Sequence, residues 1–214
     1  MDCCQCRGIE TQFDRDTAAR KLREYRRHGP ARTTQILLDA LIGQEVAGQT
    51  LLDIGGGVGA VQLALLKAGV ARATDVDASS AYIAAAREEA AQQGYAERVS
   101  YHHGNFTSMA GALEPAGIVT LDRVICCYHD MPALVDRSSA KALRLYGLVY
   151  PRDTWWVRAG VRAANAILWL ERSAFRIFAH RSAAVDAIVL RNGLQKCFAR
   201  NSGMWQIVVY ARPE

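Results

Sequence analysis

The sequence predicts an α/β fold in which a mostly parallel sheet is covered by helices on both faces. Short apolar runs that suit strands alternate with helix-like patterns from residue 49 onward, which is the pattern of repeated βαβ units. The run at 51–54 leads directly into a glycine-rich turn and then into a helical pattern, as at the start of an open parallel sheet. With 214 residues, the chain is most economically one domain with a substantial core.

Seven strands are expected, and the last two differ from the rest. Residues 201–203 read Asn-Ser-Gly, a turn that joins two strand-like runs into a hairpin. A closing antiparallel hairpin distinguishes this layout from an all-parallel sheet. The expected strands are 51–54, 71–77, 99–106, 117–127, 142–150, 194–200 and 205–211.

Helices are expected before the first strand and between the later ones. Gly29-Pro30 separates two helices ahead of the sheet, and Gly94 ends a long alanine-rich helix after the second strand. The expected helices are 14–28, 33–42, 61–66, 81–93, 131–139 and 182–191, with a helical insertion at about 153–180.

The most informative feature is the turn at 55–59, in which four of the five residues are glycine. Glycine lets backbone N–H groups approach a ligand closely, and the helical pattern that follows aims a helix N-terminus at the same point. Both properties are typical of a nucleotide or nucleoside site.

Two templates fit this turn. The stretch from Gly55 to Ala60 satisfies the dinucleotide fingerprint G-x-G-x-x-A, whereas D-x-G-x-G-x-G from Asp53 to Gly59 resembles the first motif of class I S-adenosylmethionine (SAM)-dependent methyltransferases. Asp53 favours the second template, because a carboxylate at the strand end would repel a diphosphate, and SAM carries a sulfonium and an ammonium instead. The resemblance implies a Rossmann-like seven-stranded sheet with its last strand antiparallel, an N-terminal helical lid and SAM as cofactor. It also implies a pocket for the methionine part of SAM, shaped by Asp53, Gly55, Gly57 and Gly59.

Two further motifs of that family follow in the same order. The strand at 71–77 ends in Asp77, about 20 residues past the glycines, where a ribose-binding carboxylate belongs. In the family the acid that closes this strand holds the ribose hydroxyls. Asp77 is the matching residue, and Asp75, on the same face of the strand, is the alternative. The family's G-[DN]-[FAL] motif matches residues 104–106, which implies that Asn105 meets the adenine amino group and Phe106 covers the ring.

The end of the expected fourth strand carries the candidate catalytic residue. The family places groups that face the transferred methyl at this strand end, and His129 lies there. A neutral imidazole can take a proton from an attacking hydroxyl or thiol. The alternative is a histidine that caps the following helix or holds the loop.

Within the family, the chain resembles the magnesium-protoporphyrin IX methyltransferases, which esterify a propionate carboxylate. The stretch from Cys126 to His129 is comparable with their C-x-x-x-x-H-Y strand ending, and residues 148–152 with their turn after strand five. A helix pair before the glycine motif and a long helical insertion are shared as well. The resemblance implies Tyr25 as a second candidate catalytic residue, but it assigns no porphyrin to this chain.

The insertion contains a stripe of mostly basic side chains at helical spacing, backed by apolar residues. Three interpretations remain open: a helix packed on the sheet edge with a solvated side, a lid over a large flat or acidic substrate, and a helix at 155–178 resting on anionic lipid. The stripe comprises Arg158, Arg162, Asn165, Trp169, Arg172 and Arg176.

The cysteines form two groups, one at the N-terminus and one at the end of the expected fourth strand. They could converge on a soft metal ion or metalloid, or hold a thiol, arsenic or selenium acceptor. However, the spacing lacks the C-x-x-C pairs of usual zinc sites, so no metal ligand is assigned. The alternative is that the N-terminal cysteines belong to a flexible terminus and that the two strand-end cysteines are small buried residues without a ligand. The residues concerned are Cys3, Cys4, Cys6, Cys126 and Cys127.

The net charge of +5 is concentrated on helical segments, where solvated helix faces explain it. Basic residues are not interleaved with aromatic ones, and the Asn/Asp-Pro-Pro-Tyr type of motif is missing, so no nucleic-acid partner is expected. No segment has about 18 uninterrupted apolar residues, and the N-terminus lacks a basic-then-apolar signal pattern. We therefore expect a cytoplasmic protein with mostly reduced cysteines.

Together these observations predict a cysteine-rich segment and helical cap at 1–45 and a SAM-binding methyltransferase domain at 46–214. The predicted activity is transfer of a methyl group from SAM to an oxygen, or less readily a sulfur, nucleophile of a small or medium-sized molecule. The alternatives are a thiol or metalloid methyltransferase that uses the cysteines, a non-catalytic SAM-binding protein, and a dinucleotide-dependent oxidoreductase, against which Asp53 argues.

Overall fold

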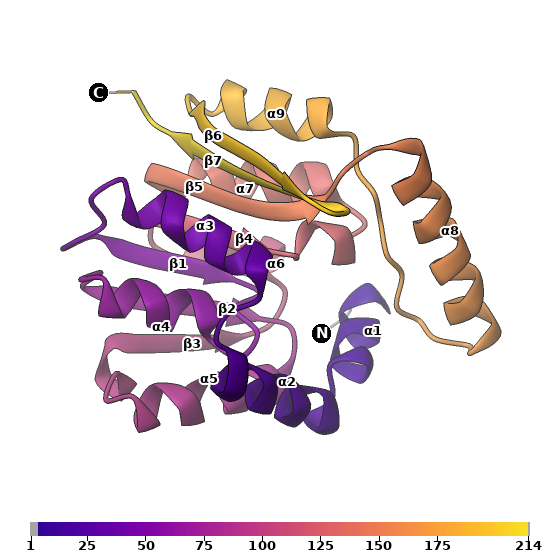
Figure 1. Ribbon diagram of the computed structural model, residues 1–214, viewed down its shortest axis with the longest axis horizontal. Coiled ribbons are helices and arrows are strands. Elements are labelled where there is room, and N and C mark those ends of the chain that lie inside the picture. The colour runs from indigo at the N-terminus through magenta and orange to yellow at the C-terminus, as the bar shows by residue number, and fades with distance from the viewer. Residues whose placement is uncertain (1–3, 214) are drawn as a thin grey trace.

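A computed structural model describes residues 4–213, and within them it shows a seven-stranded sheet with the order β3-β2-β1-β4-β5-β7-β6 (Figure 1). Neighbours from β3 to β5 pair in parallel, whereas β7 runs antiparallel to both β5 and β6. The α/β class and the antiparallel closing hairpin are thus confirmed. The strands are β1 (Thr50–Ile54), β2 (Arg72–Asp77), β3 (Val99–His103), β4 (Ala116–Asp122), β5 (Ala142–Pro151), β6 (Gln195–Ser202) and β7 (Trp205–Ala211).

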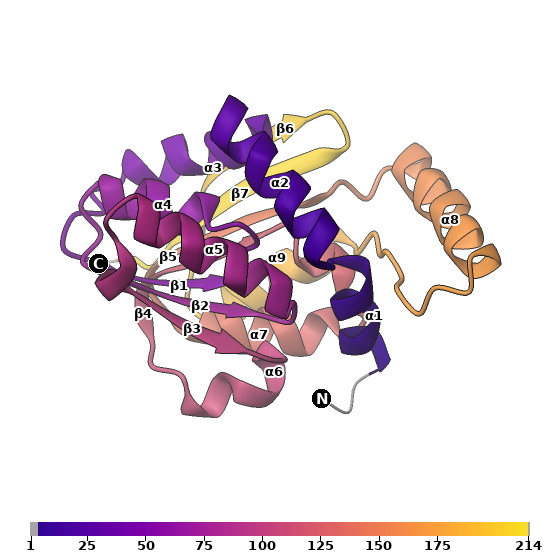
Figure 2. The ribbon, with the colours of Figure 1, turned by 90° about the horizontal axis from the view of Figure 1, so that it is seen from below.

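Helices cover both faces of this sheet. α3 and α4 pack on one face with α5 beside them, while α7 and α9 pack together on the other. α1 and α2 cross the end of the sheet at which β1 and β2 finish (Figures 1 and 2). The helices are α1 (Cys4–Gln12), α2 (Arg15–His28), α3 (Arg32–Ile42), α4 (Ala60–Lys67), α5 (Ser80–Gln92), α6 (Phe106–Met109), α7 (Met131–Ala140), α8 (Trp155–Leu170) and α9 (Ser182–Arg191).

The sheet separates two apolar cores, and the strand pleat explains which residue enters which. Successive side chains of a strand point to opposite faces, so Ile118 joins the core under α3 and α4 while Val119 joins the core under α7 and α9. Both faces of the central strands are covered, which accounts for the nearly continuous apolar run of β5. The polar residues at the carboxyl ends of the parallel strands mark an edge of the sheet at which a ligand can bind.

Three expectations about element length were wrong. The third strand was expected to span 99–106, but β3 ends at His103 and α6 begins at Phe106. The fourth strand was expected to reach residue 127, but β4 ends at Asp122, because Arg123 adopts a left-handed backbone (φ 61°) and the 3-10 turn η3 (Ile125–Cys127) follows. The basic stripe of the insertion was expected to continue to Arg176 on one helix. Instead α8 ends at Leu170, and Arg172 has a φ of 55°, so Arg172 and Arg176 lie beyond the helix.

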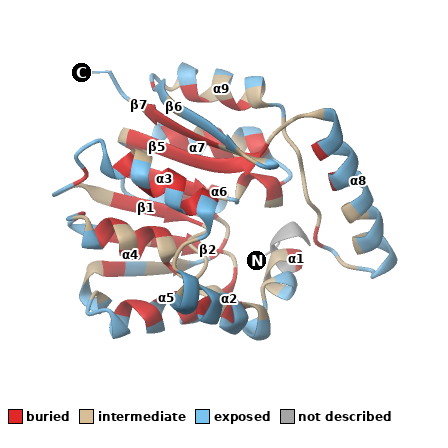
Figure 3. Cartoon of the chain, viewed as in Figure 1, coloured by how far each residue is buried: buried red, intermediate tan, exposed pale blue. Residues whose placement is uncertain are grey.

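α8 stands away from the rest of the molecule, as both ribbon views show (Figures 1 and 2). Only Val157 and Val161 of this helix are buried, and most of its surface is exposed (Figure 3). None of the helices in the described part of the chain combines the length and apolar character needed to cross a membrane.

Candidate functional site

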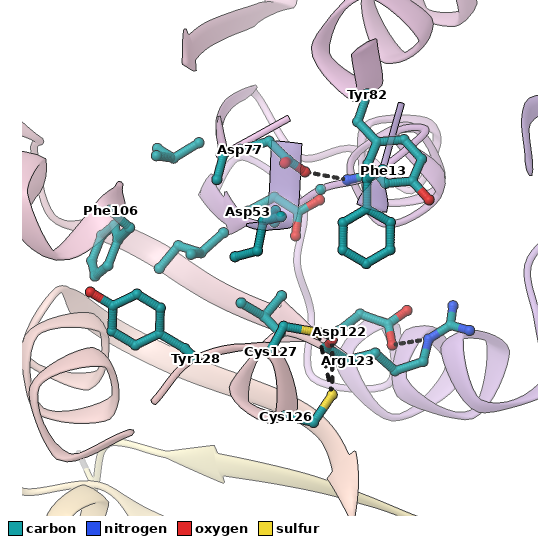
Figure 4. A pocket seen from close by; sticks show the side chains of 18 of the residues that line it. Phe13, Asp53, Asp77, Tyr82, Phe106, Asp122, Arg123, Cys126, Cys127 and Tyr128 are labelled. Carbon is teal, nitrogen blue, oxygen red and sulfur yellow. Dashed lines mark hydrogen bonds and ion pairs between the residues drawn. The ribbon is translucent and has the colours of Figure 1, made fainter. Parts of the chain in front are cut away.

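A cavity of about 470 Å³ opens where β1, β2 and β4 end (Figure 4). Its walls come from the glycine turn, the three strand ends, α1, the segment after α8 and the turn before β7. Phe106 and Tyr128 lie at one end of the cavity and Arg123 at the other. The volume suits one medium-sized organic ligand.

The glycine turn is held open by backbone conformations that glycine favours. Gly55 has a φ of 69°, and a Cβ there would lie 2.5 Å from a methyl of Val124. A Cβ on Gly56 would lie 2.6 Å from a carboxylate oxygen of Asp75. Gly57, with a φ of 58°, lines the cavity, and a Cβ there would meet nothing within 4 Å. The turn thus presents bare backbone to the cavity at Gly57 and packs tightly against the protein at its two preceding glycines.

Gly59 has a different position from the other predicted glycines. It precedes the first residue of α4 with a φ of 87° and is buried, and it does not line the cavity. Its left-handed backbone is what turns the chain into α4, so it shapes the turn without facing a ligand.

Asp77 ends β2 and lines the cavity, as its predicted role requires. Its carboxylate accepts hydrogen bonds from the backbone N–H groups of Gly57 (3.1 Å) and Ser79 (2.8 Å). The side chain is fixed between the two turns that form this part of the wall. Burial raises its pKa to about 6, because a charged carboxylate is poorly solvated there.

Asp53 ends β1 and lines the same cavity. One carboxylate oxygen accepts the hydroxyl of Thr120 at 2.7 Å, while the other is buried without a partner among the described residues. Burial raises the pKa of Asp53 to about 7. A buried acceptor that lacks a donor is unfavourable, so this oxygen is suited to receive a donor from a ligand.

Asp75, the alternative ribose ligand, lies beneath the turn and does not line the cavity. Gln62 donates to it at 3.0 Å and the N–H of Gly56 at 3.3 Å. Burial also raises the pKa of Asp75 well above its usual range. The hydrogen bonds of Asp75 stabilise the glycine turn. Of the two carboxylates, Asp77 is therefore the one that a ligand in the cavity can reach.

Asn105 and Phe106 line the cavity at the start of α6. The Asn105 amide donates to the Tyr128 hydroxyl at 3.1 Å, and its oxygen caps α6 by accepting from the N–H of Thr107 at 3.1 Å. The Tyr128 hydroxyl also contacts the Thr107 hydroxyl at 2.7 Å. Sequence reasoning missed Tyr128, because no spacing links it to the motif at 104–106.

The opposite end of the cavity is charged, which sequence reasoning also missed. Arg123 donates to the Asp122 carboxylate at 3.1 Å and to the Thr34 hydroxyl at 3.3 Å, and Thr34 donates to Asp122 at 2.5 Å. Lys21 of α2 lines the cavity as well. Arg123 is thus paired with Asp122, and Lys21 is paired with Glu24 at 2.8 Å, so each cation of the cavity wall has one carboxylate beside it and can still accept a polar or anionic group of a ligand.

Aromatic side chains from distant parts of the sequence cover the cavity. The ring of Phe13 lies 5.5 Å from that of Tyr82 and 5.6 Å from that of Phe175, centroid to centroid. The Ser79 hydroxyl donates to the Phe13 carbonyl at 2.7 Å, which ties the end of α1 to the turn that carries Asp77. The N-terminal helices therefore form part of the roof.

Neither candidate catalytic residue lines the cavity. His129 is exposed, and its ring lies 5.2 Å from the Tyr128 ring. Tyr25 is half-buried between α2 and α5, and its hydroxyl hydrogen-bonds Gln93. The structure does not bring these two residues together.

Two of the cysteines considered as metal or acceptor ligands line the cavity. The Cys126 and Cys127 sulfurs are 3.8 Å apart, and both thiols point to the carbonyl of Arg123. The contact with Cys127, together with burial, raises the pKa of the Cys126 thiol. Cys3 lies outside the described residues, and Cys4 and Cys6 belong to the first two turns of α1. No cluster of three or more metal-ligating side chains occurs among the residues whose side chains the structure describes.

Comparison with known proteins gives this geometry a family context. Residues 51–146 match the methyltransferase domain family. A stretch of 70 residues is 39% identical to ribosomal protein L11 methyltransferase of Serratia proteamaculans (strain 568), covering 33% of this chain and 24% of that protein. The chain thus spans about a quarter of the length of the curated relatives it matches.

Solved structures resemble the whole chain more fully, at low sequence identity. The magnesium protoporphyrin IX methyltransferase of Synechocystis PCC 6803 with bound S-adenosylhomocysteine (SAH) superposes with a TM-score of 0.73 at 17% identity, covering 96% of this chain and 98% of that one. An O-methyltransferase family protein of Burkholderia thailandensis superposes with a TM-score of 0.73 at 13% identity, covering 97% of this chain and 62% of that one. These likenesses show that the fold is that of class I SAM-dependent methyltransferases.

Proposed function

Because residues 51–146 match the methyltransferase domain family and the chain has the class I fold, we propose that it transfers a methyl group from SAM to a small or medium-sized acceptor molecule. The observation that carries the proposal is the set of polar groups that the glycine turn and the strand ends present to the cavity. Asp53, Gly57 and Asp77 come from three separate segments and face the same space.

These residues fit SAM better than they fit a dinucleotide. The unpartnered oxygen of Asp53 suits the ammonium of the methionine part, and Asp77 suits the ribose hydroxyls. The adenine would be met by polar groups and an apolar ring: the amide of Asn105, the hydroxyl of Tyr128 and the ring of Phe106. A diphosphate beside two buried carboxylates would be repelled.

When bound, SAM supplies an electrophilic methyl group on its sulfonium. The chain's own contribution is to hold the acceptor in line with that methyl and to exclude water. Phe13, Tyr82 and Phe175 cover the cavity with apolar surface, and Arg123 and Lys21 offer positive charge to an oxygen anion of the acceptor. We propose an oxygen acceptor for this reason.

A general base is needed only for some acceptors. A carboxylate is already a nucleophile at neutral pH, whereas a hydroxyl must lose a proton. For a hydroxyl acceptor we retain His129 and Tyr25 as candidate catalytic residues, and His129 would have to turn toward the cavity to act. Turnover of a His129→Gln variant within about twofold of the wild type would remove His129 from the mechanism.

The proposal is tested by calorimetric titration of the reduced protein with SAH and, separately, with NADH. We expect micromolar binding of SAH and no binding of NADH. Radiolabelled SAM is then offered with carboxylic acids, phenols, porphyrins and thiols, and methyl transfer identifies the acceptor class. Binding of NADH in place of SAH would refute the proposal, and SAH binding with no transfer to any acceptor would favour a non-catalytic SAM-binding protein.

The cysteine pair favours a second candidate function, methylation of a thiol or metalloid. Two sulfurs bound to one tetrahedral ion at about 2.3 Å each lie about 3.8 Å apart. The Cys126 and Cys127 sulfurs already have that separation, and both residues line the cavity. On this proposal Cys126→Ser and Cys127→Ser abolish turnover of a trivalent arsenical or thiol and leave SAH affinity unchanged. Replacing Cys3, Cys4 and Cys6 by serine tests whether the N-terminal thiols take part.

A further inference from the structure

α8 packs against very little of the rest of the protein. Its 16 residues include two buried ones, Val157 and Val161, and the chain reaches it from β5 and leaves it toward α9. Both ribbon views show it projecting beyond the other helices (Figures 1 and 2). An isolated helix of this length is marginal in water, so its solvent-facing side needs an explanation.

That side is apolar, which is unusual for an exposed helix. Trp155 (77% exposed), Trp169 (68%) and Leu170 (72%) have most of their surface in solvent, and Trp156 and Ile167 are exposed as well. Three of the protein's four tryptophans therefore lie on this one helix. Figure 3 shows the helix almost wholly exposed, in contrast to the sheet. Such a surface is typical of a site that something covers.

The charge on α8 is of one sign. Residues 155–170 contain Arg158 and Arg162 and no acidic residue. Both arginines are exposed, and neither pairs with a carboxylate within the described part of the chain. At helical spacing Arg158 lies at the border of the exposed apolar face beside Trp169, and Arg162 lies between Trp169 and Trp155. Arginine at the border of a face rich in tryptophan and leucine is the composition of helices that lie in a membrane interface.

We propose that α8 docks the protein on an anionic phospholipid surface, with Trp155, Trp169 and Leu170 inserted at the level of the headgroups. Tryptophan is favoured there because its ring is apolar and its N–H can still reach water or a headgroup. Arg158 and Arg162 then contact lipid phosphates while their stems cover apolar surface. A second copy of this chain is a poorer occupant, because it would bring the same arginines against each other without any acid on the helix.

The place of α8 relative to the cavity gives this docking a consequence. Pro151 lies just before the helix and Phe175 and Ile177 lie just after it, and all three line the cavity. A membrane-bound α8 therefore brings the apolar rim of the cavity to the lipid surface. An acceptor dissolved in the bilayer would reach the cavity without crossing water.

Vesicle sedimentation tests the proposal independently of any catalytic activity. The full chain is mixed with vesicles of phosphatidylcholine alone or with about one-third phosphatidylglycerol, at low and high salt. We expect binding to the anionic vesicles only, with loss at high salt. A Trp155→Ser/Trp169→Ser/Leu170→Ser variant should bind at least about tenfold more weakly, and Arg158→Gln/Arg162→Gln roughly 30-fold more weakly.

Matched controls distinguish docking through α8 from non-specific adsorption of exposed apolar side chains to vesicles. Leu143 and Leu190 are exposed leucines on β5 and α9, so Leu143→Ser and Leu190→Ser should bind vesicles as the wild type does. Circular dichroism and SAH titration of every variant verify that the fold persists. Equal binding to neutral and anionic vesicles, or no binding to either, overturns the proposal. So does a concentration-dependent dimer in sedimentation velocity that the α8 substitutions abolish.

Discussion

The two ends of the cavity are built in different ways. The glycine-turn end, around Asp53, Gly57 and Asp77, consists of short turns that follow successive strands, and its carboxylates are buried and hydrogen-bonded except for one oxygen of Asp53. The other end, around Phe13, Arg123 and Phe175, gathers residues from the segments that follow α1, β4 and α8, and we call it the acceptor end because we propose that the acceptor binds there. The first end is determined by local geometry, and the second by how distant segments pack.

This difference separates what the fold keeps constant from what it can vary. Moving Asp77 or Gly57 would disturb the strand ends and the start of α5, because both are tied into those turns. Phe175 lies on a connecting segment and can change without altering the sheet. A ligand shared by many enzymes belongs at the first end, and a ligand particular to one enzyme belongs at the second.

The largest expected effect concerns the buried charge at the glycine-turn end. The pKa of Asp53 is about 7 in the folded protein and near 3.8 in the unfolded chain, and burial is the cause. Between these values the folded state holds a proton that the unfolded chain has released, so the free energy of unfolding falls as pH rises from about 4 to 7. The loss amounts to as much as about 4 kcal/mol for this group.

Chemical denaturation of the ligand-free protein across that pH range measures this effect. An Asp53→Asn variant should flatten the pH dependence, and at pH 8 it should be more stable than the wild type while binding SAH more weakly. Unfolding free energies that rise with pH would mean that the acidic residues at this end are not buried as described.

The next effect compares two carboxylates that differ in access to the cavity. Asp77→Ala should lower SAH affinity at least about 100-fold, because hydrogen bonds to a charged group contribute about 1.5–3 kcal/mol each. Asp75→Asn is the matched control, since Asp75 is equally buried but does not line the cavity, and it should lose far less affinity. Calorimetric titration distinguishes the two, and equal losses would contradict the separate roles.

Two neighbouring glycines of the turn should respond differently to substitution by alanine, one through a steric clash and the other through its backbone conformation. Gly56→Ala would push a methyl against the Asp75 carboxylate and should cost about 1–3 kcal/mol of stability. Gly57→Ala has open space but a positive φ, so it should cost only about 1–2 kcal/mol and act mainly on ligand binding. Thermal unfolding with and without SAH tests the pair. A Gly56→Ala variant with wild-type stability would show that the turn is looser than these contacts indicate.

The smallest effect belongs to the acceptor end. Arg123→Gln should raise the KM for an anionic acceptor about tenfold and leave SAH affinity unchanged, because the guanidinium lies at the end of the cavity away from Phe106 and Tyr128. Arg123→Lys should recover part of the loss through its charge. Steady-state kinetics with the acceptor found by screening provide the measurement. A change in SAH affinity as large as the change in KM would remove the distinction between the two ends.

The sequence predicted the sheet and the glycine-turn end because both depend on local patterns. The succession of strands along the chain follows from alternating apolar and helical patterns, and the positions of Asp53, Asp77 and Asn105 follow from motifs at consecutive strand ends. Arg123, Tyr128 and Phe175 escaped prediction, because they enter the cavity through tertiary packing. The left-handed Arg123, which ends β4 early, gave no composition signal either, since arginine rarely adopts that conformation.

The hydrogen bond between Ser79 and the carbonyl of Phe13 links the roof to the floor of the cavity. Glu10 of α1 adds to it by accepting the N–H of Ser80 at 3.1 Å and contacting His103 at 3.2 Å. The turn that these bonds anchor is also the one that positions Asp77. If α1 moved away, that turn would lose these hydrogen bonds. The same hydrogen bonds therefore control both access of the acceptor to the cavity and binding of SAM to Asp77. By thermodynamic reciprocity, a ligand that stabilises the turn also stabilises the closed roof, and an acceptor that closes the roof raises the affinity for its co-reactant by the same factor.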